Sequence, residues 1–248
     1  HSSGTGLMTD HMTPWQRYQQ DLERPDFQKD PAQADAVQRL QSLYDKLVAA
    51  ESERQKGLAK LRIKLRKGRE EPVKGLYFWG GVGRGKTYLM DTFYESLPFD
   101  RKMRVHFHRF MQRVHRELKS LAGEKNPLIS VADRIADEAR VICFDEFFVS
   151  DIADAMILAN LLKELFALNV CLVTTSNITP DLLYREGLQR QQFLPAIALI
   201  KQHCHVINVD GGVDYRLRAL EKAPLYCTPL DAKAEEDIVG TTPSTTKA

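Results

Sequence analysis

Five short runs of apolar and β-branched residues recur along the chain and are separated by longer segments of mixed polarity. The third is among the most hydrophobic, with four consecutive apolar residues in Val141-Ile142-Cys143-Phe144. Near-continuous hydrophobicity is typical of a strand covered on both faces of a parallel sheet. The pattern predicts five strands, within residues 75–80, 104–110, 139–147, 169–177 and 204–210.

Between these runs, apolar residues recur with the period of an α-helix. One helical set contains Leu89, Met90, Phe93 and Leu97. A second set contains Met156, Leu158, Leu161, Leu162, Leu165 and Phe166. Strands that alternate with helices predict a parallel sheet with helices on both sides, so the expected fold class is α/β.

Residues 12–70, ahead of the first strand, are expected to form a helical segment. One amphipathic helix begins close to Asp35, with an apolar face made of Val37, Leu40, Leu43, Tyr44, Leu47 and Val48. Residues 54–69 then hold eight Lys or Arg and no acid. Such a segment is typical of contact with nucleic acid, an acidic protein or a membrane surface, and equally of a solvated helix face.

The remaining boundaries follow from composition. We expect residues 1–11 to be an expression scar, residues 71–230 to form the main domain and residues 231–248 to be a polar, disordered tail. No internal repeat is present.

The chain has 248 residues, of which 43% are hydrophobic and 27% charged, and a formal net charge of +2. This is enough material for a full core, and the near-neutral total leaves a local basic patch possible. The sequence contains no run of 18 apolar residues, the length that would predict a membrane span. The cysteines lack metal-ligand spacing, which indicates core residues in a reducing compartment, either the cytoplasm or the mitochondrial matrix: Cys143, Cys171, Cys204 and Cys227. Of the two, the cytoplasm is the expected location.

Residues 80–87 match G-x-x-x-x-G-K-[ST], the phosphate-binding loop, between a predicted strand and a predicted helix. Glycines let backbone N–H groups surround a phosphate at the helix N-terminus. Lys86 is expected to reach the β- and γ-phosphates, and the Thr87 hydroxyl to bind Mg²⁺. The loop consists of Gly80, Gly81, Val82, Gly83, Arg84, Gly85, Lys86 and Thr87.

An acidic pair follows the third apolar run in the stretch "VICFDEF". Asp145, at the end of a buried strand, is expected to hold Mg²⁺. Glu146 is expected to act as the general base for the attacking water. Hydrolysis is therefore the predicted reaction.

The stretch "LVTTSN" ends the fourth run with polar residues. Asn177 is predicted to contact the γ-phosphate or the attacking water. The alternative is that Asn177 caps the helix suggested by "SNITPDLL".

These residues resemble the ZapE family, AAA+ ATPases associated with bacterial cell division that also have mitochondrial relatives. The resemblance spans residues 13–230. It rests on "GLYFWGGVGRGKTYLMD", "HFHRFMQRVH", "CFDEFFVSDIADAM", "TTSN", "LYREGLQRQQFLPAI" and "VDYR".

The resemblance implies a P-loop AAA+ core with strand order 5-1-4-3-2 that hydrolyses ATP with Mg²⁺. It implies FtsZ polymer as the partner in bacteria, and a homo-oligomer when nucleotide is bound. A neighbouring subunit's arginine would contact the γ-phosphate, with Arg190 as first choice and Arg185 as second. Tyr88, Phe27 and Gln33 would join the nucleotide-binding set.

Arginine and histidine residues lie within the second apolar run and directly after it. Arg109 is expected to sense nucleotide from the end of the second strand. His106, His108 and His115 are interpreted as structural rather than as metal ligands.

The chain departs from the family where a helical lid with a second sensor should follow the fifth strand. The lid is expected to be missing; Arg216 and Arg218 lie near where that sensor would begin.

The alternative function is a DNA-handling, helicase-loader-like ATPase, in which the basic residues Lys60, Arg62, Lys64 and Arg66 would contact phosphates. A small-molecule kinase is disfavoured because Glu146 stands beside Asp145. A GTPase is disfavoured because no N-K-x-D motif is present.

Overall fold

A computed structural model of the chain describes residues 11–59, 72–81 and 83–210. The chain divides into a unit of His1–Val209 and a second unit of Asp210–Ala248, of which only Asp210 is described. Several expectations therefore lie outside the described residues. They concern residues 1–10, the basic residues from Lys60 to Arg69, Val82, Arg216, Arg218, Cys227 and the tail 231–248.

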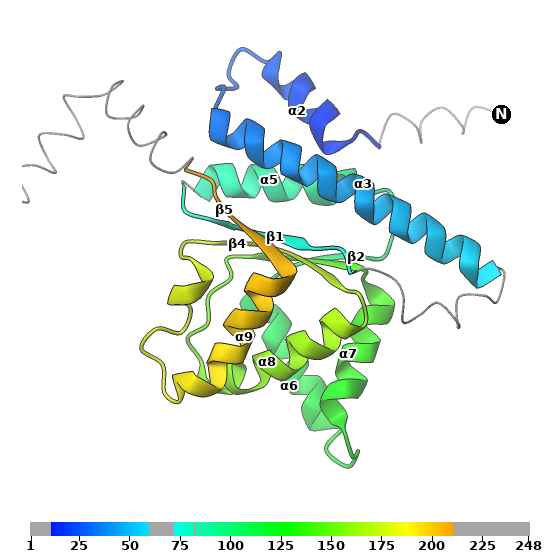
Figure 1. Ribbon diagram of the computed structural model, residues 1–248, viewed down its shortest axis with the longest axis vertical. Coiled ribbons are helices and arrows are strands. Elements are labelled where there is room, and N and C mark those ends of the chain that lie inside the picture. The colour runs from blue at the N-terminus through cyan, green and yellow to red at the C-terminus, as the bar shows by residue number, and fades with distance from the viewer. Residues whose placement is uncertain (1–10, 60–71, 82, 211–248) are drawn as a thin grey trace, which may run out of the picture. The chain divides into compact units, whose positions relative to one another are not determined.

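The five predicted strands form one parallel sheet (Figure 1). Their order, β2-β3-β4-β1-β5, is the predicted order read from the opposite edge. The strands are β1 (Gly75–Trp79), β2 (Lys102–His106), β3 (Val141–Asp145), β4 (Cys171–Ser176) and β5 (Cys204–Asn208). The predicted α/β class and strand order are confirmed.

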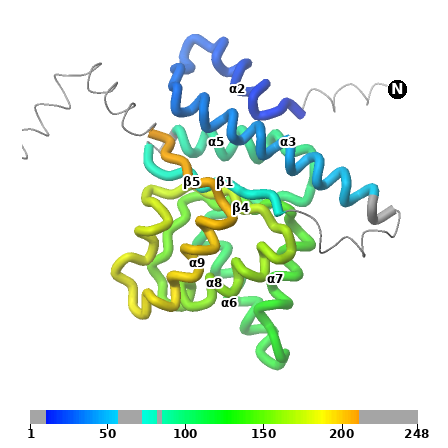
Figure 2. Tube along the Cα trace, viewed as in Figure 1, coloured from blue at the N-terminus to red at the C-terminus, as the bar shows by residue number. Residues whose placement is uncertain are grey.

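Helices cover both faces of the sheet, as the alternation of runs predicted (Figures 1 and 2). One face is covered by α2 (Pro14–Leu22), α3 (Pro31–Ala59) and α5 (Gly83–Ser96). The other is covered by α6 (Phe107–Ser120), α7 (Pro127–Glu138), α8 (Ile152–Ala167) and α9 (Arg190–His203). A short 3₁₀ helix, η1 (Pro180–Leu182), lies between β4 and α9.

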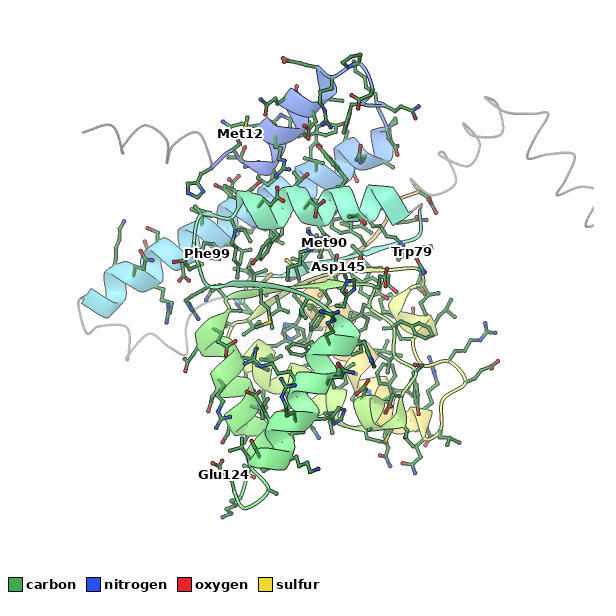
Figure 3. The ribbon with its side chains drawn as sticks, turned by 180° about the vertical axis from the view of Figure 1, so that it is seen from behind. Met12, Trp79, Met90, Phe99, Glu124 and Asp145 are labelled. Atoms are coloured by element: carbon green, nitrogen blue, oxygen red, sulfur yellow. The ribbon has the colours of Figure 1, made fainter. Side chains whose placement is uncertain are left out.

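Alternate residues of each strand enter different hydrophobic cores because successive strand side chains point to opposite faces. In β3, Val141 and Cys143 pack with α3 and α5, whereas Ile142 and Phe144 pack with the helices of the other face. Seen from behind, Met90 lies in α5 on the first side, and Glu124 marks the loop between α6 and α7 (Figure 3). Both faces are buried, which explains the unbroken apolar runs.

The predicted amphipathic helix of the N-terminal segment is present as α3. Its apolar stripe is buried against the α5 side of the sheet, with Val37, Leu40 and Leu47 fully inaccessible. Glu51, on the same helix, is 4% exposed and forms ion pairs with Arg101 and Arg54. The N-terminal helices are thus part of the folded core and not an appendage.

The second predicted strand, 104–110, was wrong at its C-terminal end. Strand β2 stops at His106, and Phe107 begins α6. The apolar residues from Phe107 onward have helical spacing: Phe107, Phe110, Met111 and Val114 are buried on one side of α6. The helix follows the strand without a connecting loop, so the two periods merge into one apolar run.

Candidate nucleotide site

Two glycines at the start of the phosphate-loop sequence have a backbone conformation that favours glycine. Gly80 and Gly81 have φ angles of 81° and 73°, a region that favours glycine. Helix α5 begins at Gly83, so its N-terminal N–H groups face the end of the loop. A Cβ added at Gly85 would meet no atom within 4 Å, so the chain's own packing does not require this glycine. These features fit a phosphate group at the loop.

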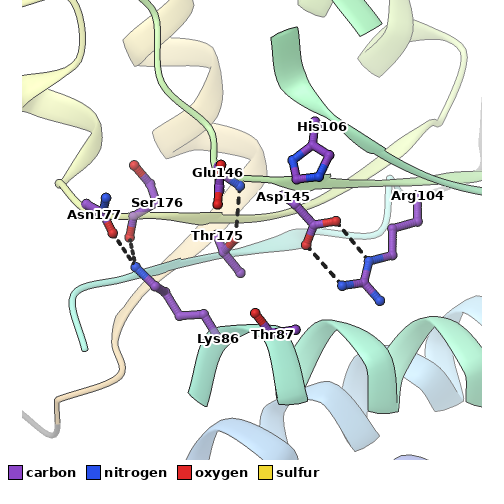
Figure 4. Close-up of a pocket in the computed structure, with 9 residues that line it drawn as sticks. All are labelled: Lys86, Thr87, Arg104, His106, Asp145, Glu146, Thr175, Ser176 and Asn177. Carbon is purple, nitrogen blue, oxygen red and sulfur yellow. Dashed lines mark hydrogen bonds and ion pairs between the residues drawn. The ribbon is translucent and has the colours of Figure 1, made fainter. Parts of the chain in front are cut away.

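A cavity of about 530 Å³ lies where α5 faces the ends of β3 and β4 (Figure 4). The carboxyl ends of neighbouring parallel strands are the usual ligand position in open α/β sheets. Five of the residues predicted from the sequence meet in this cavity: Lys86, Thr87, Asp145, Glu146 and Asn177. The cavity is completed by Arg104, His106, Thr175 and Ser176.

Lys86 reaches across the cavity to the end of β4. Its Nζ donates hydrogen bonds to Asn177 Oδ1 at 2.6 Å and to the Ser176 carbonyl oxygen at 3.1 Å (Figure 4). The lysine is 6% exposed, so its charge lies within the wall of the cavity. Asn177 contacts Lys86, whereas η1 has Thr179 at its N-cap position. The geometry therefore favours the phosphate-side interpretation of Asn177 over the helix-cap alternative.

Asp145 and Glu146 point differently because the backbone turns between them. Asp145 is the last residue of β3, and Glu146 has a φ of 53°, uncommon for a residue with a side chain. Hydrogen bonds to β4 hold this turn: Glu146 N–H donates to Thr175 Oγ1 at 3.3 Å, and Phe147 N–H donates to the Thr175 carbonyl at 2.8 Å. Backbone strain of this kind costs about 1–3 kcal/mol and clusters at active sites.

The oxygen donors at the cavity suit a hard divalent cation. Thr87 supplies a hydroxyl and Asp145 a carboxylate, the ligand types that Mg²⁺ prefers. Both Asp145 oxygens accept hydrogen bonds from Arg104 of β2, at 2.9 and 3.2 Å. Desolvation disfavours the charged guanidinium, but the bonds to Asp145 and Asp91 outweigh it and raise the pKa of Arg104.

Arg104 was missed in the sequence. The available signal was a cation inside a strand, in "KMRVH", where a parallel sheet normally carries apolar residues. Arg109 was the arginine predicted to sense nucleotide from the end of the second strand. It lies instead in the first turn of α6, and its side chain is exposed. The error arises because strand β2 and helix α6 merge into one apolar run.

Two of the residues expected to bind nucleotide, Phe27 and Tyr88, lie together. Phe27 packs its ring against Tyr88, the residue after Thr87, with a centroid distance of 5.2 Å. Tyr88 also donates a hydrogen bond to Asp21 Oδ2 at 2.5 Å, which ties α2 to α5. Gln33 lies in the first turn of α3 and is half-buried. Phe27 and Tyr88 are adjacent to the phosphate loop but do not line the cavity.

The two candidate trans-acting arginines differ in their surroundings. Arg190 donates hydrogen bonds to the backbone carbonyls of Asp181, Leu183 and Tyr184, at 2.6, 3.3 and 3.1 Å. Arg185 is exposed on the same loop and lines a shallow hollow with Phe148 and Leu182. Arg190 therefore braces the loop, while Arg185 is accessible to another molecule.

The three histidines occupy separate places. His106 lines the cavity, His108 is hydrogen-bonded to Gln112, and His115 contacts Asp154 at 2.6 Å. Within residues 11–59, 72–81 and 83–210, no three His, Cys, Asp or Glu side chains group to hold a metal.

No helix in the described part of the chain has both the length and the apolar character needed to cross a membrane.

Residues 12–245 match the family model of AFG1-like ATPases. The chain belongs to the AFG1-like ATPase family. The resemblance drawn from the sequence motifs is thereby confirmed, together with the P-loop ATPase class of the site.

Named relatives within this family share much of the sequence. The chain is 54% identical over 234 residues to the cell division protein ZapE of Escherichia coli (strain K12), covering 91% of this chain. It is 43% identical over 179 residues to lactation elevated protein 1 homolog B of Danio rerio, covering 67% of this chain and 36% of the relative. The chain spans 62% of the length of the Escherichia coli relative.

Solved structures resemble the chain more distantly. The crystal structure of DnaI has a TM-score of 0.46 at 17% identity, covering 73% of this chain and 87% of that one. The crystal structure of the DnaC helicase loader has a TM-score of 0.46 at 14% identity, covering 77% and 98%. Likeness at this level carries no information about function.

Proposed function

We propose that this chain binds ATP at the cavity between α5 and the ends of β3 and β4, and hydrolyses it with Mg²⁺. The observation that supports the proposal is the meeting of five predicted residues at one cavity, after a loop in which Gly80 and Gly81 have positive φ angles. Membership of an ATPase family supports the same reaction.

Each residue then has a role set by its position. The loop N–H groups and Lys86 bind the phosphate oxygens, and Thr87 with Asp145 holds the Mg²⁺. When bound, the ion neutralises charge on the phosphate oxygens. Asn177 contacts Lys86 and therefore lies beside the position expected for the terminal phosphate.

Glu146 acts on water. Its carboxylate accepts a proton from the attacking water as the water oxygen bonds to the γ-phosphorus. The bond from that phosphorus to the bridging oxygen breaks, and the products are ADP and phosphate. The backbone turn at Glu146 directs its side chain differently from that of Asp145, which suits separate roles for the two carboxylates, one towards the metal and the other towards water.

The test is phosphate release by the wild-type chain and by Glu146→Gln, with Mg²⁺ or with EDTA. Loss of the general base is expected to lower turnover by about 10²-fold or more. Affinity for a fluorescent ATP analogue is expected to stay close to wild type, since the amide retains the size of the side chain. Glu53→Gln, on the exposed side of α3, is the matched control. Turnover that does not change in Glu146→Gln would refute the mechanism.

We further propose that the active form is a homo-oligomer in which an arginine of one subunit contacts the γ-phosphate of its neighbour. The contacts of Arg190 with three carbonyls reverse the order of the two candidates and favour Arg185. Arg185→Ala is expected to lower turnover by about 10³-fold or more at high protein concentration and to leave the melting temperature unchanged. If only Arg190→Ala lowers turnover and does so without loss of stability, the assignment to Arg185 is wrong.

The proposed partner is FtsZ polymer in the cytoplasm. Support comes from the resemblance to the ZapE family and from the cell-division relative in Escherichia coli. Sedimentation of FtsZ polymers is expected to decrease when the chain and ATP are added together, and not with Glu146→Gln. A response to DNA with no response to FtsZ would contradict this proposal and support the helicase-loader alternative.

A further inference from the structure

Arg104 connects the two sides of the cavity. Its guanidinium binds both oxygens of Asp145 through Nε and Nη2, at 2.9 and 3.2 Å (Figure 4). Its third nitrogen, Nη1, forms an ion pair with Asp91 of α5. One cation thus binds two carboxylates on different elements at the same time, each through different nitrogens.

The parallel register explains why Arg104 reaches both. Arg104 is paired with Cys143 of β3, which belongs to the core on the α5 side. Paired residues of neighbouring strands share a face, so Arg104 also points towards α5. Asp145 follows Cys143 by two residues and has the same face. Asp91 follows Thr87 by four residues on α5, and residues four apart on a helix share a side.

The exposure of the three side chains differs. Those of Arg104 and Asp145 are 21% and 18% exposed, whereas that of Asp91 is 43% exposed. The bond between Arg104 and Asp145 is therefore less screened by water than the bond to Asp91. A charge-assisted, two-point pair of this kind is among the stronger hydrogen-bonded contacts in proteins.

We propose that Arg104 is a positioning residue that sets the Mg²⁺ requirement of the site by competing for the Asp145 carboxylate, with Asp91 as its second acceptor. This inference rests on the proposed function, because it assumes that Asp145 holds the metal. The guanidinium occupies the two oxygens that a metal or its water ligand needs, and its positive charge opposes a second cation nearby.

Opposite effects are therefore expected from the two partners. Arg104→Gln removes the competitor, so half-maximal nucleotide binding should need about five- to tenfold less Mg²⁺. Asp91→Asn leaves Asp145 as the remaining carboxylate for Arg104 and should raise the Mg²⁺ requirement by a similar factor. In the double variant, Asp91→Asn should have almost no effect, because Asp91 acts through Arg104.

The assay is binding of a fluorescent ATP analogue to the full chain while MgCl₂ is titrated, with a second measurement in EDTA. Affinity in EDTA gives the metal-free baseline of each variant, because Arg104 lines the cavity, and the Mg²⁺ requirement is measured relative to that baseline. Arg113→Gln is the matched control. Arg113 has a similar side-chain exposure of 24% and makes two bonds to Glu138, away from the cavity.

The outcomes separate the two proposals. If the wild-type chain shows no Mg²⁺-dependent nucleotide binding, the proposed function fails, and this inference fails with it. If the wild type shows it but Arg104→Gln needs more Mg²⁺, then Arg104 supports the metal site and does not compete with it. If Asp91→Asn has the same effect with and without Arg104, then Asp91 acts on the ion directly. Either of the last two results overturns the inference alone.

Discussion

Replacing Gly75 with alanine tests how closely the central strand must pack. Gly75 opens β1, which lies between β4 and β5 in the sheet. A Cβ at this position would lie 1.7 Å from the carbonyl oxygen of Leu172 and 2.7 Å from its carbonyl carbon. Cβ contacts below 3.0 Å are essentially absent from proteins, so the two strands must separate locally by at least about 1.3 Å.

The size of the effect follows from the place of β1 in the sheet. The clash is with backbone, so a side-chain rotation cannot relieve it, and moving β1 disturbs its pairing with both neighbours. Overpacking and backbone shifts typically cost about 1–3 kcal/mol, and a clash with backbone belongs at the upper end, about 3 kcal/mol out of a total stability of about 5–15 kcal/mol. The melting temperature should fall by about 6–12 °C.

Urea and thermal unfolding followed by circular dichroism measure this change. Gly123→Ala is the matched control, because a Cβ there would meet no atom within 4 Å, and its effect should stay within about 0.5 kcal/mol. The strand ends next to the phosphate loop, so affinity for the ATP analogue should fall as well. If Gly75→Ala unfolds at the same urea concentration and temperature as Gly123→Ala, the sheet accommodates the methyl group and the steric argument is wrong.

Four further predictions concern other parts of the molecule. Burial raises the pKa of the Cys171 thiol to about 12, and the thiols of Cys143 and Cys204 are shifted in the same direction. These three thiols should react with a disulfide reagent at pH 8 only after unfolding, as a comparison with and without urea would reveal. The same shifts imply that the free energy of unfolding falls as pH rises above about 9, because the thiols then ionise in the unfolded chain and stay protonated in the folded one. A free energy of unfolding that stays constant from pH 8 to 10 would contradict the burial of these thiols. Asp151 caps α8 by accepting hydrogen bonds from the N–H groups of Ala153 and Asp154. Asp151→Ala should therefore lower the free energy of unfolding in urea by about 1 kcal/mol. The control Asp133→Ala, at an exposed position, should leave that free energy unchanged. Tyr77→Phe removes a 2.7 Å hydrogen bond to the carbonyl of Ile178 and should cost about 1–2 kcal/mol; an unchanged midpoint would indicate that water replaces the hydroxyl.

Several features of this chain follow from local chemistry and can be read from its sequence. The strands could be predicted because a parallel sheet buries both faces, which leaves unbroken apolar runs such as Val141–Phe144. The phosphate loop could be predicted because close contact with a ligand dictates glycines at fixed spacing, and Gly80 and Gly81 indeed have positive φ. Asp145, Glu146 and Asn177 could be placed at the cavity because each stands at the end of a strand or directly after it, and strand ends meet at one edge.

Other features depend on contacts between segments far apart in the sequence. The pairing of Arg104 with Asp145 joins residues 41 positions apart, and it exists only because β2 and β3 share one register. Nothing in the sequence near Arg190 indicated that its guanidinium would bind three carbonyls of its own loop. The end of β2 at His106 could not be read either, because the helix follows the strand directly and its buried residues, from Phe107 onward, continue the apolar run of the half-buried strand.

The sequence by itself thus determined the elements and most of the chemical groups of the site, because these follow from local periodicity, backbone geometry and ligand chemistry. The tertiary structure decided which charges face one another. An ion pair depends on the register of strands and on the direction of side chains across a cavity, and neither is encoded in the spacing of residues along one segment.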